Sequence, residues 1–202
     1  MLSLCIDTAY KYLCVCLISD DKIVDALSFE CYKRQSEEVF VALDKLFKRS
    51  GINKADVDSI CISKGPGSYT GVRIAMSLAK VYCQVKKIKL YTLSTLRLYA
   101  GNKANTMVIM DARANRAYVG IYDKGEVVLK DCIKEIKDIE VKDCSVLLDG
   151  HLLGKQDVVP DIPDCFLKLK DKWEEVKDIN FLVPEYLKES ESYYRWKSKD
   201  LK

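Results

Sequence analysis

Short apolar runs and stretches of helical period alternate along the first half of the chain. Runs of about four to eight mostly apolar residues predict strands, and apolar residues at every third or fourth position predict helices. The predicted strands are 2–6, 12–18, 22–29, 59–63 and 89–92. The predicted helices are 35–49, 70–85 and a short helix that Ser94 begins and Gly101 ends. This order of elements predicts an α/β fold with a mixed sheet.

The second half of the chain has a different pattern. A polar stretch at 101–104 precedes predicted strands at 106–110, 117–122, 126–130 and 146–148. Beyond His151, prolines interrupt the pattern and no element is predicted. We therefore expect two lobes, 1–102 and 103–202. The second lobe is expected to be the smaller, with the end of the chain packing back on the first.

The predicted helix 35–49 carries more apolar residues than one core needs. Its core stripe, at helical spacing, consists of Val39, Leu43, Leu46 and Phe47. Phe40 and Val41 lie off this stripe. The pattern therefore predicts an apolar surface that extends beyond the core-facing side of this helix.

The composition favours a globular protein of the cytoplasm. Hydrophobic residues make up 49% of the 202 positions, which is enough for a sizeable core. The 33 basic and 30 acidic residues leave a net charge of +3, so charge alone gives no case for nucleic-acid binding. The nine cysteines form no Cys-x-x-Cys pair, which favours reduced thiols in the core. No stretch approaches the roughly 20 apolar residues that span a membrane, so no membrane partner is expected.

A glycine-rich loop lies between the predicted strand 59–63 and the predicted helix 70–85. Gly65, Pro66, Gly67 and Gly71 predict a tight structural turn, in which Gly65 and Gly67 supply backbone angles closed to other residues. Ser68 or Thr70 is a candidate N-cap. The spacing fits neither a Walker loop nor the dinucleotide fingerprint, since both require a glycine where Thr70 stands. A structural turn is therefore favoured over a phosphate site.

The loop sequence Gly-Pro-Gly-Ser-Tyr-Thr-Gly-Val-Arg, at 65–73, closely resembles the signature of the TsaB family, also called YeaZ. Weaker similarities lie at 5–8, 93–96, 110–113, 118 and 183–187. The resemblance implies an actin-like, ribonuclease H-like fold of two lobes, with mixed sheets flanked by helices. It also implies a non-catalytic subunit that supports transfer of threonylcarbamoyl to the adenosine beside the tRNA anticodon.

In that family the chemistry belongs to the paralogue TsaD. The resemblance therefore implies TsaD and the ATPase TsaE as partners, with tRNA reached through the complex. A homodimer is an alternative assembly when the chain is alone. ATP or ADP and any metal are expected to belong to the partners rather than to this chain.

The residues themselves offer little for catalysis. Actin-like proteins hold nucleotide phosphate with the first hairpin, and here Asp7 is followed by Thr8 and Ala9 where a glycine is expected. Asp7 is the one candidate nucleotide contact, and its role as a turn residue is favoured. His151 is the single histidine, so neither a catalytic residue nor a metal ligand is predicted.

Two other functions remain as alternatives. A glycoprotease-like hydrolase would need a nucleophile with a base, or a metal-bound water, and no histidine lies near Ser68 or Thr70 in the sequence. A small actin-like kinase would need the phosphate hairpin intact. Both rank below the assembly subunit.

A polar cluster at 111–116 joins two predicted strands. Arg113 and Arg116 would contact tRNA or carboxylates of a partner, since guanidinium groups suit both. Alternatively the segment is an ordinary hairpin turn in which Asp111 pairs with Arg113. Both interpretations remain open at this point.

The resemblance also suggests where a partner docks, because TsaB and TsaD pair through their first two helices. We therefore expect a docking surface on 35–49 and 70–85, with small Ala75 and Ala79 allowing close approach. Its predicted contact residues are Val39, Phe40, Leu43 and Met76, with Arg73 and Lys80 at the rim.

Overall fold

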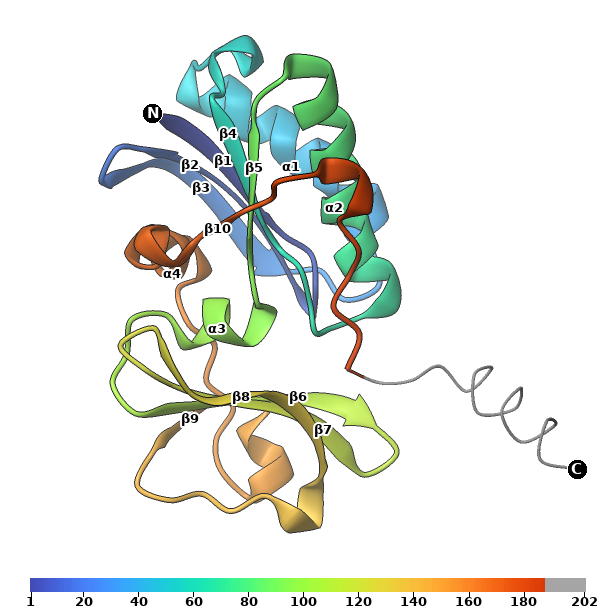
Figure 1. Cartoon of the computed structure of the whole chain (residues 1–202), viewed down its shortest axis with the longest axis vertical. Coiled ribbons are helices and arrows are strands. Elements are labelled where there is room, and N and C mark those ends of the chain that lie inside the picture. The colour runs from blue at the N-terminus through green and yellow to red at the C-terminus, as the bar shows by residue number, and fades with distance from the viewer. Residues whose placement is uncertain (188–202) are drawn as a thin grey trace, which may run out of the picture.

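The computed structural model describes residues 1–187 and contains two sheets, one in each lobe (Figure 1). The first sheet has the strand order β10-β5-β4-β1-β2-β3. Its strands are β1 Leu2–Asp7, β2 Tyr12–Ser19, β3 Lys22–Glu30, β4 Ser59–Ser63, β5 Lys89–Leu93 and β10 Glu174–Glu175. The first three form an antiparallel meander, whereas β4 pairs parallel to β1 and β5 parallel to β4. The prediction of a mixed sheet is confirmed.

The second sheet has four strands in the order β8-β7-β6-β9. They are β6 Thr106–Arg113, β7 Arg116–Asp123, β8 Glu126–Glu135 and β9 Ser145–Leu148. The first three are antiparallel, and β9 runs parallel to β6. Each begins within a residue of the predicted start, so the strand predictions for this half are also confirmed.

Helices cover both faces of the first sheet. The long helices α1, Gln35–Ser50, and α2, Tyr69–Lys86, pack on one face. The short helices α3, Thr95–Ala100, and α4, Ile162–Lys168, contribute to the core on the other face, toward the second lobe. Because side chains alternate along a strand, β1 sends Leu4 and Ile6 under the long helices and Cys5 to the opposite core. The central strands β1, β2 and β4 are therefore buried on both sides, whereas the edge strands β3 and β10 are partly exposed.

The helix ends follow the signals in the sequence. Ser68 caps α2 by accepting a hydrogen bond from the Gly71 amide at 3.2 Å, and Ser94 caps α3 in the same way. Gly51, with φ 69°, ends α1 in the left-handed region. Single 3₁₀ turns occur at Lys54–Asp56, Ile136–Asp138, Gly150–Leu153, Lys170–Lys172 and Ile179–Phe181.

After residue 160 the chain returns to the first lobe. Helix α4 packs against β3 and β2, and β10 pairs antiparallel with β5. The segment that follows runs beside α2 (Figure 1). Residues 174–175, which lie within the range 103–202 expected for the second lobe, therefore belong to the first sheet.

The cysteines and the lengths of the helices also bear on what was expected from the sequence. The nine cysteines are free thiols, and most of them are buried. Within residues 1–187, no helix is both long enough and apolar enough to cross a membrane.

Candidate functional site

The glycine-rich loop packs directly on the first hairpin. The Ser68 amide donates to the carbonyl of Ala9 at 2.7 Å, and the Thr8 hydroxyl donates to the carbonyl of Gly71 at 2.6 Å. A Cβ added to Gly67 would overlap the Ala9 carbonyl, and one added to Gly71 would overlap the Thr8 carbonyl. The glycines therefore serve the close approach of two backbone segments.

The expectation that Gly67 supplies an unusual backbone angle is wrong. The positive φ in this loop, 109°, is at Gly65. Gly67 is required for space instead, because the hairpin backbone occupies the place of its side chain. At Gly65 both restrictions act, since an added Cβ would lie 2.5 Å from the Glu185 carbonyl oxygen.

Asp7, the candidate nucleotide contact, is fully buried and already bonded. Its Oδ1 accepts from the Ala9 amide at 3.1 Å and from the Ser63 hydroxyl, and its Oδ2 accepts from the Tyr99 hydroxyl at 2.6 Å. Burial raises the pKa of Asp7, and these three hydrogen bonds offset part of that rise. In this structure Asp7 has no exposed surface and orders the hairpin, which is the turn role favoured from the sequence.

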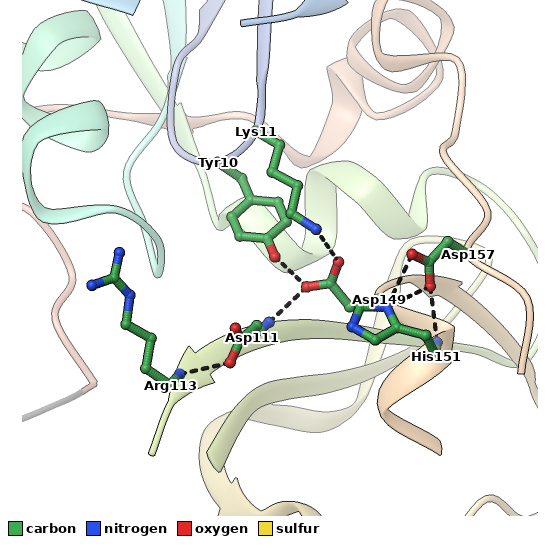
Figure 2. Close-up of polar contacts among 7 residues, drawn as sticks. All are labelled: Tyr10, Lys11, Asp111, Arg113, Asp149, His151 and Asp157. Carbon is green, nitrogen blue, oxygen red and sulfur yellow. Dashed lines mark hydrogen bonds and ion pairs between the residues drawn. The ribbon is translucent and has the colours of Figure 1, made fainter. Parts of the chain in front are cut away.

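A second polar cluster ties the first hairpin to the second lobe (Figure 2). Asp149 follows β9 and is 2% exposed. Its carboxylate accepts from the Tyr10 hydroxyl, from Lys11 Nζ at 2.7 Å and from the Asp111 amide at 2.8 Å. Asp149 could not be identified from local pattern, because Tyr10 and Lys11 are 139 and 138 residues away from it in the chain.

The charges in this cluster affect one another. Burial alone lowers the pKa of Lys11, but its hydrogen bond and charge interaction with Asp149 more than offset this and raise it. Burial raises the pKa of Tyr10, and its bond to Asp149 raises it further. The cluster therefore holds one carboxylate between a neutral phenol and a cation, across the junction of the two lobes.

His151 lies beside this cluster and is bonded to a second carboxylate. Its Nδ1 is 2.8 Å from Asp157 Oδ1, and both side chains are about half exposed (Figure 2). Ligand atoms of Asp149, His151 and Asp157 all lie within 4.8 Å of one another. Both Asp149 oxygens already accept from protein donors, and the Lys11 ammonium supplies positive charge there. A metal ion would have to displace Lys11, so this donor set does not form a ready cation site.

The polar turn at 111–116 is a hairpin between β6 and β7. Asp111 Oδ1 accepts from the backbone amide of Arg113 at 2.7 Å. The predicted pairing of Asp111 with Arg113 is therefore made through the backbone, and Figure 2 shows the guanidinium pointing away from that carboxylate. Arg113, Ala114 and Asn115 all have positive φ, and all three are exposed at the tip.

The two long helices expose apolar side chains, as the sequence suggested for α1. Phe40 is 67% exposed and Val41 46%. On α2, Val81 is 63% exposed and Val85 74%. The outward stripe of α2 is completed by half-buried residues, and its members at helical spacing are Ile74, Leu78, Val81 and Val85. We call Phe40, Val41 and this stripe the helix face; Val41 lies at its edge next to β3, where it lines a hollow with Leu27 and Phe29.

Several predicted contact residues lie elsewhere. Val39, Leu43 and Met76 are buried in the core beneath the helices, so assigning them to the docking surface is wrong. Ala75 and Ala79 are fully buried there as well. These residues pack against the sheet. The second apolar stripe of α2 was not predicted, because the first stripe already accounted for a core.

Arg73 and Lys80, the predicted rim residues, lie on the side of α2 next to the C-terminal segment. Arg73 Nε donates to the Tyr186 hydroxyl at 2.8 Å. Lys80 Nζ donates to the backbone carbonyls of Asn180 and Leu182 at 3.1 and 3.0 Å. Both cations therefore join α2 to the last part of the described chain.

Known proteins resemble this chain over nearly its whole length. The family model described as TsaD, tRNA N6-adenosine threonylcarbamoyltransferase, matches residues 30–142, more than half of the chain. The tRNA threonylcarbamoyladenosine biosynthesis protein TsaB of Bacillus subtilis is 27% identical over 224 aligned positions, which cover 97% of this chain and 98% of that protein.

Solved structures agree with the sequence comparison. YeaZ from Pseudomonas aeruginosa superimposes with a TM-score of 0.78 at 18% identity, covering 92% of this chain and 99% of that one. A second Pseudomonas aeruginosa structure, of an uncharacterized protein with similarity to peptidase YEAZ, gives a TM-score of 0.80 at 18% identity and covers 93% and 99%. The predicted actin-like fold is therefore confirmed, and the chain belongs to the TsaD family of that model and, within it, to the TsaB (YeaZ) proteins.

Proposed function

We propose that this chain takes part in tRNA threonylcarbamoyladenosine biosynthesis as a non-catalytic assembly subunit. It docks through its helix face on a TsaD-type paralogue, which carries the transferase chemistry. TsaE joins this assembly in the cytoplasm, and tRNA is reached through the complex. Nucleotide and metal are held by the partners.

The exposed helix face carries this proposal. Four large apolar side chains on α1 and α2 are between 46% and 74% exposed, although both helices already have a complete core side. An apolar patch with charged residues at its edge is the usual anatomy of a specific interface. The matching helices of a paralogue with the same fold would cover it.

The packed hairpin supports the absence of catalysis. Three hydrogen-bond donors surround the Asp7 carboxylate. The hairpin backbone occupies the space beside Gly67 and Gly71 of the glycine loop, so this space is not open to a ligand. The Ser68 hydroxyl is engaged as the cap of α2. His151 is bonded to Asp157 in the loop after β9, on the other lobe from Ser68.

The test is reconstitution with purified components. Threonylcarbamoyladenosine formation on tRNA is measured with the paralogue and TsaE, with and without this chain. We expect formation to require this chain, and Phe40→Asp to abolish both complex formation and the stimulation.

The chain alone is assayed for ATP and peptide hydrolysis, because one structural neighbour is described as similar to a peptidase. We expect neither activity. ATP turnover by the isolated chain that disappears in Asp7→Ala would support the kinase alternative, and peptide hydrolysis that survives repurification would support the hydrolase.

A further inference from the structure

The C-terminal part of the described chain forms a strap, residues 179–187, that runs beside α2 and the glycine loop (Figure 1). Lys80 Nζ holds two strap carbonyls, those of Asn180 and Leu182. At its other end, the Glu185 amide donates to the Lys64 carbonyl at 2.8 Å. The strap is therefore fixed to α2 near one end and to the loop after β4 near the other.

One residue of the strap orients an arginine of α2. The Tyr186 hydroxyl accepts from Arg73 Nε at 2.8 Å, and its ring stacks on Tyr69 with centroids 5.2 Å apart and an interplanar angle of 19°. The Arg73 guanidinium carbon lies 4.0 Å from the Tyr69 ring centroid and 5.8 Å from that of Tyr186. Two rings and one hydrogen bond thus fix the plane of the guanidinium.

The far edge of this guanidinium is open. Arg73 is exposed, and its two Nη atoms have no hydrogen-bond or ion-pair partner within residues 1–187. An arginine presents its donors as a planar fork that matches a carboxylate with two parallel bonds. Holding that fork in place before binding lowers the entropy cost of using it.

The position of Arg73 indicates which anion it meets. Arg73 lies one residue before Ile74 and therefore about 100° around α2 from the stripe, at the edge of the helix face next to the strap. The strap adds two more exposed apolar side chains on this side, Phe181 at 82% and Val183 at 70%. Arginine and tyrosine are also the residue types most enriched among energetically dominant interface positions.

We propose that Arg73, clamped by Tyr69 and Tyr186, is a pre-oriented anchor for a carboxylate of the protein that docks on the helix face. This inference rests on the proposed function and identifies an acidic residue of the partner as the group recognised. The strap acts on binding through Arg73, so Tyr186 is a positioning residue.

The test compares four variants in binding to the purified paralogue, at low and at high salt. Arg73→Ala should raise the dissociation constant by about 30-fold and flatten its salt dependence, because it removes a pre-oriented charged contact at the edge of the helix face. Arg73→Lys should recover only part of this loss, since an ammonium lacks the planar fork. Tyr186→Phe keeps the ring but loses the acceptor, and should raise the dissociation rate about 3-fold to 10-fold. Lys130→Ala, an exposed cation of the second lobe, is the matched control and should bind normally.

The outcomes separate this inference from the proposed function. Failure of the wild-type chain to bind the paralogue would contradict the proposed function itself. Normal binding by Arg73→Ala, with binding lost in Phe40→Asp, would overturn only the anchor. Weaker tRNA binding by isolated Arg73→Ala with unchanged paralogue binding would show that the anion is a phosphate, and would also overturn it. Circular dichroism shows whether each variant is folded. If Arg73→Ala is unfolded, the binding of Arg73→Lys and Tyr186→Phe tests the anchor instead, and normal binding by both would overturn it.

Discussion

Two surfaces of the first lobe differ in how completely their groups are satisfied. Where the first hairpin meets the glycine loop, polar atoms are paired and backbone segments touch, as at Asp7 and Gly67. On the helix face, large apolar side chains such as Phe40 and Val85 stay in water. In an actin-like fold the first of these regions is where the phosphate hairpin lies.

This difference favours the helix face, rather than the hairpin, as the functional surface of the first lobe. A region that binds a phosphate needs free donors and space for the ligand, whereas here the hairpin and loop use both on each other. Exposed apolar area costs free energy unless a partner covers it, so the helix face gains by association.

The largest effect is expected at the packed loop. Gly67→Val places a branched side chain on the Ala9 carbonyl, and backbone cannot move aside as a side chain would. We expect a loss of about 3 kcal/mol or more in the free energy of unfolding, measured by urea denaturation without any partner. Ser77→Ala, at an exposed position of α2, is the control and should be near neutral. An unchanged stability with loss of binding only would mean that the loop serves a ligand.

A pair of phenylalanines on α1 tests the contrast between core and surface. Phe47 is 7% exposed and Phe40 67%, two turns apart on the same helix. Phe47→Asp should cost at least about 3 kcal/mol of stability, because it buries a charge and empties the core.

Phe40→Asp should change stability by no more than about 0.5 kcal/mol but weaken association with the paralogue by at least about 2 kcal/mol. Circular dichroism and light scattering, with and without the paralogue, give both quantities. Unfolding of the Phe40 variant would place this residue in the core instead.

A smaller effect is expected at the junction of the lobes. Tyr10→Phe removes one donor from the Asp149 carboxylate but leaves Lys11 and the Asp111 amide in place. We expect a loss of about 1–3 kcal/mol in stability, as for other hydrogen bonds to a charged group. Tyr12→Phe, at a partly exposed neighbour, is the control, and equal losses in the two variants would argue against a role for the Asp149 cluster.

The smallest effect concerns the pH dependence set by Asp7. Its pKa is raised by burial, so the folded protein binds this proton more tightly than the unfolded chain does. The stability that Asp7 contributes therefore increases as the pH falls from 7 toward about 4, and it is lost as the pH rises through the folded-state pKa.

Asp7→Asn cannot titrate, so the wild-type protein should gain stability relative to this variant on acidification. Urea unfolding of both proteins at several pH values measures the difference. A difference that stays constant or shrinks on acidification would contradict the raised pKa.

Most of the secondary structure could be predicted from local pattern, because period and caps are properties of neighbouring residues. The strands β1, β2 and β3, the cap at Ser94, Ser68 as one of two candidate caps of α2, and an apolar surface at Phe40 were all predicted in this way. Three of the predicted docking residues, Val39, Leu43 and Met76, are buried in the core instead. Periodicity marks the apolar positions of a helix but does not show which of its faces lies on the sheet.

The sequence by itself determined the elements, their order and the family signature, since each depends on residues within a few positions of one another. Only the tertiary structure decided which groups meet. It brought Asp149 to Tyr10 and Lys11, closed Asp7 behind Tyr99, and laid Tyr186 against Arg73 across 113 residues of chain. These contacts depend on how the lobes and the strap pack, and packing is set by the sum of long-range burial rather than by any local pattern.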